Sequence, residues 1–251
     1  MTAATSHPAG VRARDEWDIH RLDLDAYLQR IGHDPGRDRS GAALAGLHRA
    51  HVAAIAFENL DIVLGRGIAV DLASVQGKLV AARRGGYCYE HGLLFAAALQ
   101  RLGFTVDRRL ARIASNDGRP RARTHMVLQV HVGNERWLAD VGFGSGLLEP
   151  LPLRASGARR QGDWAYSLAS CGAGWQLREH GAEPPRVLYD FDDASQHIAD
   201  VRVANHYSST VASSPFVGRL VAVRKDEHTL HELLCRELTE TGPRRPTRRR
   251  E

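Results

Sequence analysis

The residue best placed for covalent chemistry is a cysteine that follows a pair of glycines. Cys88 comes two residues after Gly85-Gly86 and opens an apolar stretch of helical length. A helix N-terminus presents unpaired N–H groups and a partial positive charge, which stabilise a thiolate, and the glycines allow a sharp turn and close approach of a ligand. The pattern indicates a nucleophile, although many buried cysteines are inert. Cys171 and Cys235 have no comparable setting.

A histidine and an aspartate can support this nucleophile from one hairpin. Residues 125–132 alternate with period two, Gly133-Asn134 is a two-residue turn signal, and residues 136–141 are typical of the returning strand. In that register Asp140 lies diagonal to His125 on one sheet face, within hydrogen-bonding reach. Together with the cysteine they predict a Cys-His-Asp triad of nucleophile, base and orienting carboxylate. Taken alone, a single histidine on a strand is more often structural or solvated than catalytic, and the conjunction with Cys88 is what favours a catalytic role.

Other arrangements carry weaker signals. Cys88-x-x-His91 supplies two metal ligands without a matching second pair, so no metal site is expected. The glycine-rich residues 142–146 follow a strand, with no predicted helix and no lysine, which is not the pattern of a phosphate-binding loop. They form either a plain turn or the entrance to an active site built around the triad. By default we interpret Phe57, Phe143 and Phe216 as core aromatic residues. We likewise interpret Arg84 and Glu58 as a surface or structural ion pair.

The elements that must position the triad change in type along the chain. Apolar residues recur at helical spacing through much of residues 22–99, with a stop at Gly32 and an N-cap at Asp71. Period two then begins, and residues 125–132 have the pattern of a half-buried strand. Helices followed by a sheet predict an α+β fold. Further short strands are expected at 164–168, 175–178 and 220–223.

The composition excludes several classes of protein. With 251 residues, 43% hydrophobic and 25% charged, the chain is typical of a soluble globular protein. It contains no apolar run of the roughly 18–20 residues that cross a bilayer and no signal-peptide core, so we expect a cytoplasmic protein with no membrane partner. The net charge of +5 is compatible with nucleic-acid binding. However, five arginines fall within residues 244–251 and leave the remainder near neutral, so no nucleic-acid partner is expected.

Taken together, these residues resemble the arylamine N-acetyltransferases. The most specific match is the Arg-Gly-Gly-x-Cys motif, and the resemblance covers roughly residues 22 to 225. The spacing of the three triad residues also suits the family. The matching segments are Ala56-Phe57-Glu58-Asn59-Leu60, Arg84-Gly85-Gly86-Tyr87-Cys88-Tyr89-Glu90, Thr124-His125-Met126-Val127-Leu128, Trp137-Leu138-Ala139-Asp140-Val141-Gly142-Phe143-Gly144 and Asn205-His206-Tyr207-Ser208-Ser209-Thr210.

The resemblance implies a fold and a set of roles. It implies a helical N-terminal domain (1–103), a β-barrel middle domain (104–205) and a small α/β lid (206–251) around a papain-like cysteine-enzyme core. Cys88 would carry the acyl group, with His125 as the base. Asp140 would orient the base, and Glu58 with Arg84 would form a supporting ion pair. The aromatic substrate pocket would be lined by Phe57, Phe143 and Phe216. The segments near the coenzyme A site would be Thr124, the Gly142–Gly146 loop including Gly144, and Ser208–Ser214.

The chain departs from the family pattern in three places. Ala56 stands where proline is usual, and Gly92 stands where asparagine is usual. Beyond Thr239, where the family continues with a further strand and a closing helix, this chain runs into an arginine-rich stretch. We therefore expect a C-terminally shortened lid that ends in a basic tail.

The expected function is a two-step acetyl transfer with acetyl-CoA as co-substrate and no bound cofactor. Cys88 would take the acetyl group as a thioester, and an aromatic amine or hydrazine would then receive it, with His125 removing the proton of the amine. Three alternatives stay open: a macrolactam-forming amide synthase of the same family, a thioester hydrolase using the same triad, and an inactive relic. The sequence does not decide between a monomer and a homodimer.

Overall fold

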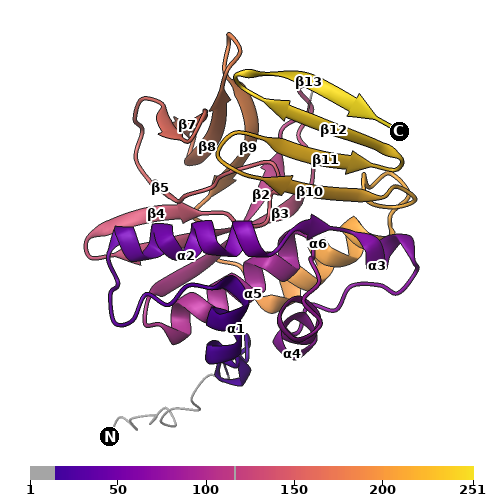
Figure 1. Cartoon of the computed structure of the whole chain (residues 1–251). Helices are drawn as coiled ribbons and strands as arrows, with labels where there is room; N and C mark the ends of the chain where they lie inside the picture. Colours follow the sequence, from indigo (N-terminus) through magenta and orange to yellow (C-terminus); the bar gives the residue numbers. More distant parts are fainter. Residues whose placement is uncertain (1–14, 116) are drawn as a thin grey trace, which may run out of the picture.

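The computed structural model describes residues 15–115 and 117–251. Most of the helices come first along the chain, and most of the strands follow them (Figure 1). None of the helices in the described residues combines the length and apolar character of a membrane span. The N-terminal elements are η1 (Ile19–Arg21), α1 (Leu24–Ile31), α2 (Gly41–Ala54), β1 (Phe57–Glu58), α3 (Leu60–Val63), α4 (Leu72–Gln76), η2 (Gly77–Ala81) and α5 (Cys88–Arg101).

Short polar side chains begin α1 and α4. The Asp23 carboxylate accepts the Ala26 N–H at 3.0 Å, and Asp71 accepts the Ser74 N–H at 2.9 Å, so both satisfy first-turn donors. α1 ends at Gly32, whose φ of 66° is a conformation that glycine adopts without steric cost. The predicted helix stop at Gly32 and N-cap at Asp71 are confirmed.

The helix α5 forms the centre of the helical layer. It begins at Cys88, as the sequence predicts, and its residues are buried from there to Leu99. A helix that is buried around its circumference belongs in a core, and α5 packs against β2, β3, α1 and α4. The backbone at Cys88 is therefore held by core packing.

The second half of the chain forms an eight-stranded antiparallel sheet, in the order β5-β4-β3-β2-β9-β8-β7-β6. Gln161 joins its two ends, because its side-chain oxygen accepts the Leu148 N–H at 2.8 Å and its amide donates to the Glu149 carbonyl at 2.8 Å. The sheet is thus curled. Its strands are β2 (Thr105–Ile113), β3 (Arg123–Val132), β4 (Glu135–Ala139), β5 (Leu151–Pro152), β6 (Arg159–Gln161), β7 (Trp164–Cys171), β8 (Gly174–His180) and β9 (Arg186–Asp192).

The β3–β4 hairpin has the register that the sequence predicts. Leu128 pairs with Ala139 across the turn at Gly133. The predicted half-burial of β3 is wrong, because the strand is buried on both faces from His125 to Val130. Even-numbered residues such as Leu128 face the helical core, and Val127 packs in a second core inside the curled sheet.

A second, five-stranded sheet contains the C-terminal residues, in the order β1-β10-β11-β12-β13 (Figure 1). The expectation of a basic tail is corrected, because the arginine-rich residues form the edge strand β13. Opposite charge accompanies this pairing, since Arg249 lies 3.4 Å from Glu237 and Arg248 pairs with Glu240 across the strands. The strands are β10 (Val221–Lys225), β11 (Leu230–Leu234), β12 (Glu237–Gly242) and β13 (Arg245–Arg250).

The helix α6 (Ile198–Thr210) connects the two sheets and packs against the start of α5. The Tyr87 hydroxyl donates to the Asn205 side chain, and the Tyr89 hydroxyl lies 3.3 Å from the Ser208 hydroxyl. The boundary predicted after residue 205 falls inside this helix, so the helix spans both sides of it. The α+β class is confirmed.

Candidate active site

Cys88 lies at the first residue of α5, and its side chain lines a cleft. Its sulfur lies 3.8 Å from the Thr124 carbonyl oxygen. Gly142 packs directly against it, since a Cβ at Gly142 would lie 2.9 Å from both the Cα and the carbonyl oxygen of Cys88. Only glycine allows this approach of two backbones. The glycine-rich segment after β4 is therefore fitted to the cysteine.

His125 and Asp140 form the pair that the hairpin register predicts. His125 Nε2 lies 2.8 Å from Asp140 Oδ2, and both side chains are buried. Asp140 also accepts the Tyr189 hydroxyl at 2.8 Å and the Gly142 N–H at 3.0 Å. Burial alone would raise the pKa of Asp140, but the charge of His125 and these hydrogen bonds lower it below its ordinary value. Asp140 is therefore a carboxylate.

His125 is the positively charged partner. Burial opposes its charge, but the Asp140 carboxylate and Cys88 outweigh burial and raise the pKa of His125 to about 10. Because Nε2 contacts Asp140, Nδ1 is the ring nitrogen left for the sulfur. The site thus places an imidazolium between a carboxylate and a cysteine.

The cleft has a volume of about 410 Å³ and contains most of the predicted substrate residues. Gly144 is the exception, because it packs behind the wall, with its Cβ position 3.1 Å from the Phe57 ring. The edge of the Phe143 ring contacts His125, with centroids 5.2 Å apart. Lining side chains named in advance are Cys88, His125, Phe57, Thr124, Phe143, Phe216, Ser208 and Ser214, and those that sequence reasoning missed include Arg121, Tyr207, Arg219, Glu232 and Leu234.

The predicted Glu58–Arg84 pair is part of a larger charge network. Arg84 donates to Glu58 at 2.8 Å and to Asp61 at 2.8 Å. Lys78 then bridges Asp61 at 2.8 Å and Glu90 at 2.9 Å. Since Glu90 Oε2 accepts the Tyr87 N–H at 3.0 Å, the network reaches the residue before the nucleophile. Sequence reasoning missed its last three members, which lie on separate elements.

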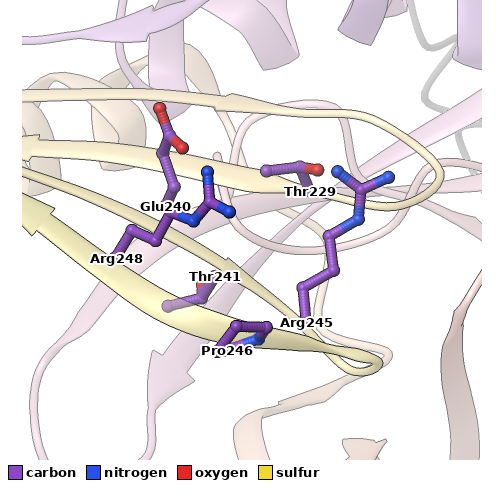
Figure 2. A pocket seen from close by; sticks show the side chains of 6 residues that line it. All are labelled: Thr229, Glu240, Thr241, Arg245, Pro246 and Arg248. Carbon is purple, nitrogen blue, oxygen red and sulfur yellow. The ribbon is translucent and has the colours of Figure 1, made fainter.

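Another hollow, of about 310 Å³, lies on the β12–β13 hairpin (Figure 2). Arg245 and Arg248 border it, and it contains none of the residues predicted for the active site. Across residues 15–115 and 117–251, no three His, Cys, Asp or Glu side chains are grouped to hold a metal ion. The predicted nucleophile and base both line the cleft at Cys88.

Comparisons with known proteins identify the family to which this chain belongs. A model of the family described as N-acetyltransferase matches residues 42–251. The arylamine N-acetyltransferase / N-hydroxyarylamine O-acetyltransferase of Salmonella typhimurium is 38% identical over 221 residues, which are 87% of this chain and 74% of that relative. This chain belongs to the arylamine N-acetyltransferase family.

Solved structures of arylamine N-acetyltransferases have the same fold. The Nocardia farcinica enzyme superposes with a TM-score of 0.86 at 40% identity, over 93% of this chain and 85% of that chain. The Mycobacterium marinum enzyme in complex with CoA gives a TM-score of 0.85 at 33% identity, over 91% and 86% of the two chains.

In this member of the arylamine N-acetyltransferase family, a buried histidine supports Asp140 from α2. His48 Nδ1 lies 2.9 Å from the Leu148 carbonyl, and Nε2 accepts the Asp140 N–H at 3.2 Å. Burial lowers the pKa of His48 to about 4, so it is neutral and carries its proton on Nδ1. Sequence reasoning missed His48, although its place among apolar helix positions was a signal.

A second buried histidine chain supports the turn before Cys88. His91 Nε2 donates to the Gly86 carbonyl at 3.0 Å, so its Nδ1 accepts from His51 Nε2 at 2.9 Å. His51 Nδ1 then accepts the Tyr27 hydroxyl at 2.9 Å. Burial lowers the pKa of His91 to about 4 and the pKa of His51 well below its ordinary value. The neutral chain has one consistent proton order, and it fixes the turn.

Proposed function

We propose that this chain transfers an acetyl group from acetyl-CoA to an aromatic amine or hydrazine through a thioester on Cys88. The observation that carries the proposal is that Cys88 and His125 line one cleft, with the buried Asp140 behind His125. Cys88 stands at a buried helix N-terminus, and the His125–Asp140 pair is joined at 2.8 Å. A helix N-terminus and an imidazolium both stabilise negative charge on sulfur.

In the first half-reaction the Cys88 sulfur attacks the carbonyl carbon of acetyl-CoA. A new sulfur–carbon bond forms while the bond to the CoA sulfur breaks, and the departing CoA thiolate takes the proton from His125. One thioester replaces another, so the step is nearly neutral in energy and the acetyl group keeps its reactivity. His125 becomes neutral and is then ready to act as a base.

In the second half-reaction the amine nitrogen attacks the acetyl carbon on Cys88. His125 takes the proton of the nitrogen, and Cys88 leaves as a thiolate beside the imidazolium of His125. Phe57, Phe143 and Phe216 give the cleft three aromatic side chains, which suit an acceptor with an aromatic ring. Relatives named for arylamines support this choice of acceptor.

We also propose finer assignments that agree with this reaction. Thr124, with Ser208 and Ser214, lies along the cleft where acetyl-CoA would enter, and the CoA complex of the Mycobacterium marinum relative supports CoA as the donor. Glu58 and Arg84 support the site through the charge network. The use of Nε2 for the carboxylate and Nδ1 for the sulfur supports a papain-like core, with helical and strand-rich domains on either side.

Intact mass after mixing with acetyl-CoA tests the proposal. We expect one acetyl adduct on the wild type and on Cys171→Ala, because Cys171 is exposed and lies outside the cleft. We expect no adduct on Cys88→Ala. Adding an aromatic amine should remove the adduct and yield the N-acetyl amine. The absence of an adduct on the wild type, or an equal adduct on Cys88→Ala, contradicts the proposal.

A further inference from the structure

The chain uses lysine only twice among its 34 basic residues, at Lys78 and Lys225. Both lysines are largely enclosed, and each ammonium contacts several oxygens. Lys78 bridges Asp61 and Glu90 in the charge network. Arginine serves elsewhere, so lysine stands where a compact group with three donors is needed. Lys225 is the one that the network beside Cys88 does not use.

The ammonium of Lys225 is enclosed on every side. Its side chain is 0% exposed. Nζ donates to the Ser145 carbonyl at 2.7 Å, to the Gly146 carbonyl at 2.9 Å and to the Tyr166 hydroxyl. It lies 3.8 Å from the centre of the Trp164 ring, a cation–π contact, and 3.9 Å from Glu179. Three oxygen acceptors match the three donors of an ammonium.

Two of these acceptors belong to the cleft wall. The wall begins at Gly142, whose N–H donates to Asp140 at 3.0 Å. At its other end, Lys225 holds the carbonyls of Ser145 and Gly146. Within the described residues, no other lysine or arginine side chain donates to these two carbonyls. Between the two ends, Phe143 contacts His125. The wall is therefore fixed at one end by the triad and at the other by the buried amino group of Lys225, whose pKa burial lowers to about 7.

We propose that Lys225 is a positioning residue for the amine acceptor, because it fixes the Gly142–Gly146 wall of the cleft. This inference rests on the proposed function. Lys225 itself does not border the cleft that contains Cys88, so it acts through the wall. The triad has its own supports in Tyr189 and His48, so loss of the ammonium should loosen acceptor binding and leave the nucleophile intact.

Three variants test this inference. Lys225→Met keeps the length of the chain but has no donor, and Tyr166→Phe removes one acceptor and the hydroxyl that donates to the Gly146 carbonyl at 3.1 Å. Arg224→Met is the matched control, because Arg224 is the exposed neighbour on the same strand and lies outside the cleft. For each variant we would measure the acceptor KM and kcat, the alkylation rate of Cys88 by iodoacetamide and the thermal midpoint.

For Lys225→Met we expect an acceptor KM raised about tenfold or more, with the iodoacetamide rate and the acetyl adduct retained. Tyr166→Phe should shift KM in the same direction by less, and it decides the question if Lys225→Met does not fold. An unchanged acceptor KM in the folded variants overturns the inference. A fall in the alkylation rate of Cys88 as large as the rise in acceptor KM overturns it as well. An absent acetyl adduct on the wild type would overturn the proposed function instead, so the two failures are distinguishable.

Discussion

Asp140 is held from several sides besides its contact with His125. Its carboxylate accepts from Tyr189 and Gly142, and its backbone N–H donates to His48. Hydrogen bonds to the charged form keep a buried carboxylate ionised. An ionised Asp140 in turn holds the proton on His125, so the charge of the imidazolium depends on the hydrogen bonds that hold Asp140.

Tyr189→Phe tests this dependence, because it removes one hydroxyl and keeps the ring. We expect the free energy of unfolding to fall by about 1.5–3 kcal/mol, the value of a hydrogen bond to a charged group. Alkylation of Cys88 by iodoacetamide should also slow, since a less firmly held carboxylate supports the imidazolium less. Urea unfolding and alkylation rates measure both effects. Unchanged stability would show that the hydrogen bond at 2.8 Å contributes nothing.

The contact between α5 and the segment after β4 decides where the triad can assemble. Gly142 lies so close to the backbone of Cys88 that a methyl group must displace one of the two. Gly92, where the family usually has asparagine, is similarly close to β3, since its Cβ position lies 2.9 Å from the Met126 sulfur. Glycines at these two positions thus let α5 lie close to β3 and to the segment after β4.

Gly142→Ala should therefore impair both catalysis and stability. We expect kcat/KM to fall by about 100-fold, because displacement by 1 Å is costly at a reacting group, and the free energy of unfolding to fall by about 1–3 kcal/mol. Gly157→Ala is the control, since a Cβ there would meet nothing within 4 Å. Steady-state kinetics and urea unfolding measure both. Equal behaviour of the two variants would contradict the prediction.

Local sequence patterns predicted the elements that carry the triad, but they did not predict the long-range contacts. The helix start at Cys88 and the β3–β4 register follow from nearby glycines and period two. The double burial of β3 does not, because polar residues such as Gln129 are buried only where a distant partner exists, here Asp107 at 3.2 Å. His48 lies 92 residues from Asp140, so no local pattern could pair them.

The strand β13 was misjudged for a related reason. Six residues with four arginines have the composition of a solvated tail. They become an edge strand because β12 offers carboxylates opposite them, and arginine and proline also protect an exposed edge from pairing with other chains. Cross-strand charge pairing depends on a register that composition alone does not show.

Across the whole molecule, buried histidines of two kinds should limit stability from opposite sides of neutral pH. His48 and His91 are neutral with a pKa of about 4, below the value of about 6.5 in the unfolded chain. As the pH falls from 6.5 toward 4, the unfolded state takes up protons that the folded state refuses, so stability decreases. His51, also neutral and buried, acts in the same direction.

His125 acts in the opposite direction, because its folded pKa of about 10 exceeds its unfolded value. Its contribution is complete below about pH 6.5 and is lost as the pH rises through 10. Lys225 acts against this loss, because burial lowers its folded pKa to about 7, and its stability contribution recovers as the pH rises from 7 toward the unfolded value of about 10.4. The free energy of unfolding should therefore fall on the acid side of pH 6.5 and change little between pH 7 and 9.5. Urea unfolding between pH 5 and 9.5 tests this, with His48→Gln expected to flatten the acid side and His125→Gln expected to make stability rise with pH above 7. Slopes in both variants that parallel the wild type would refute the assignment.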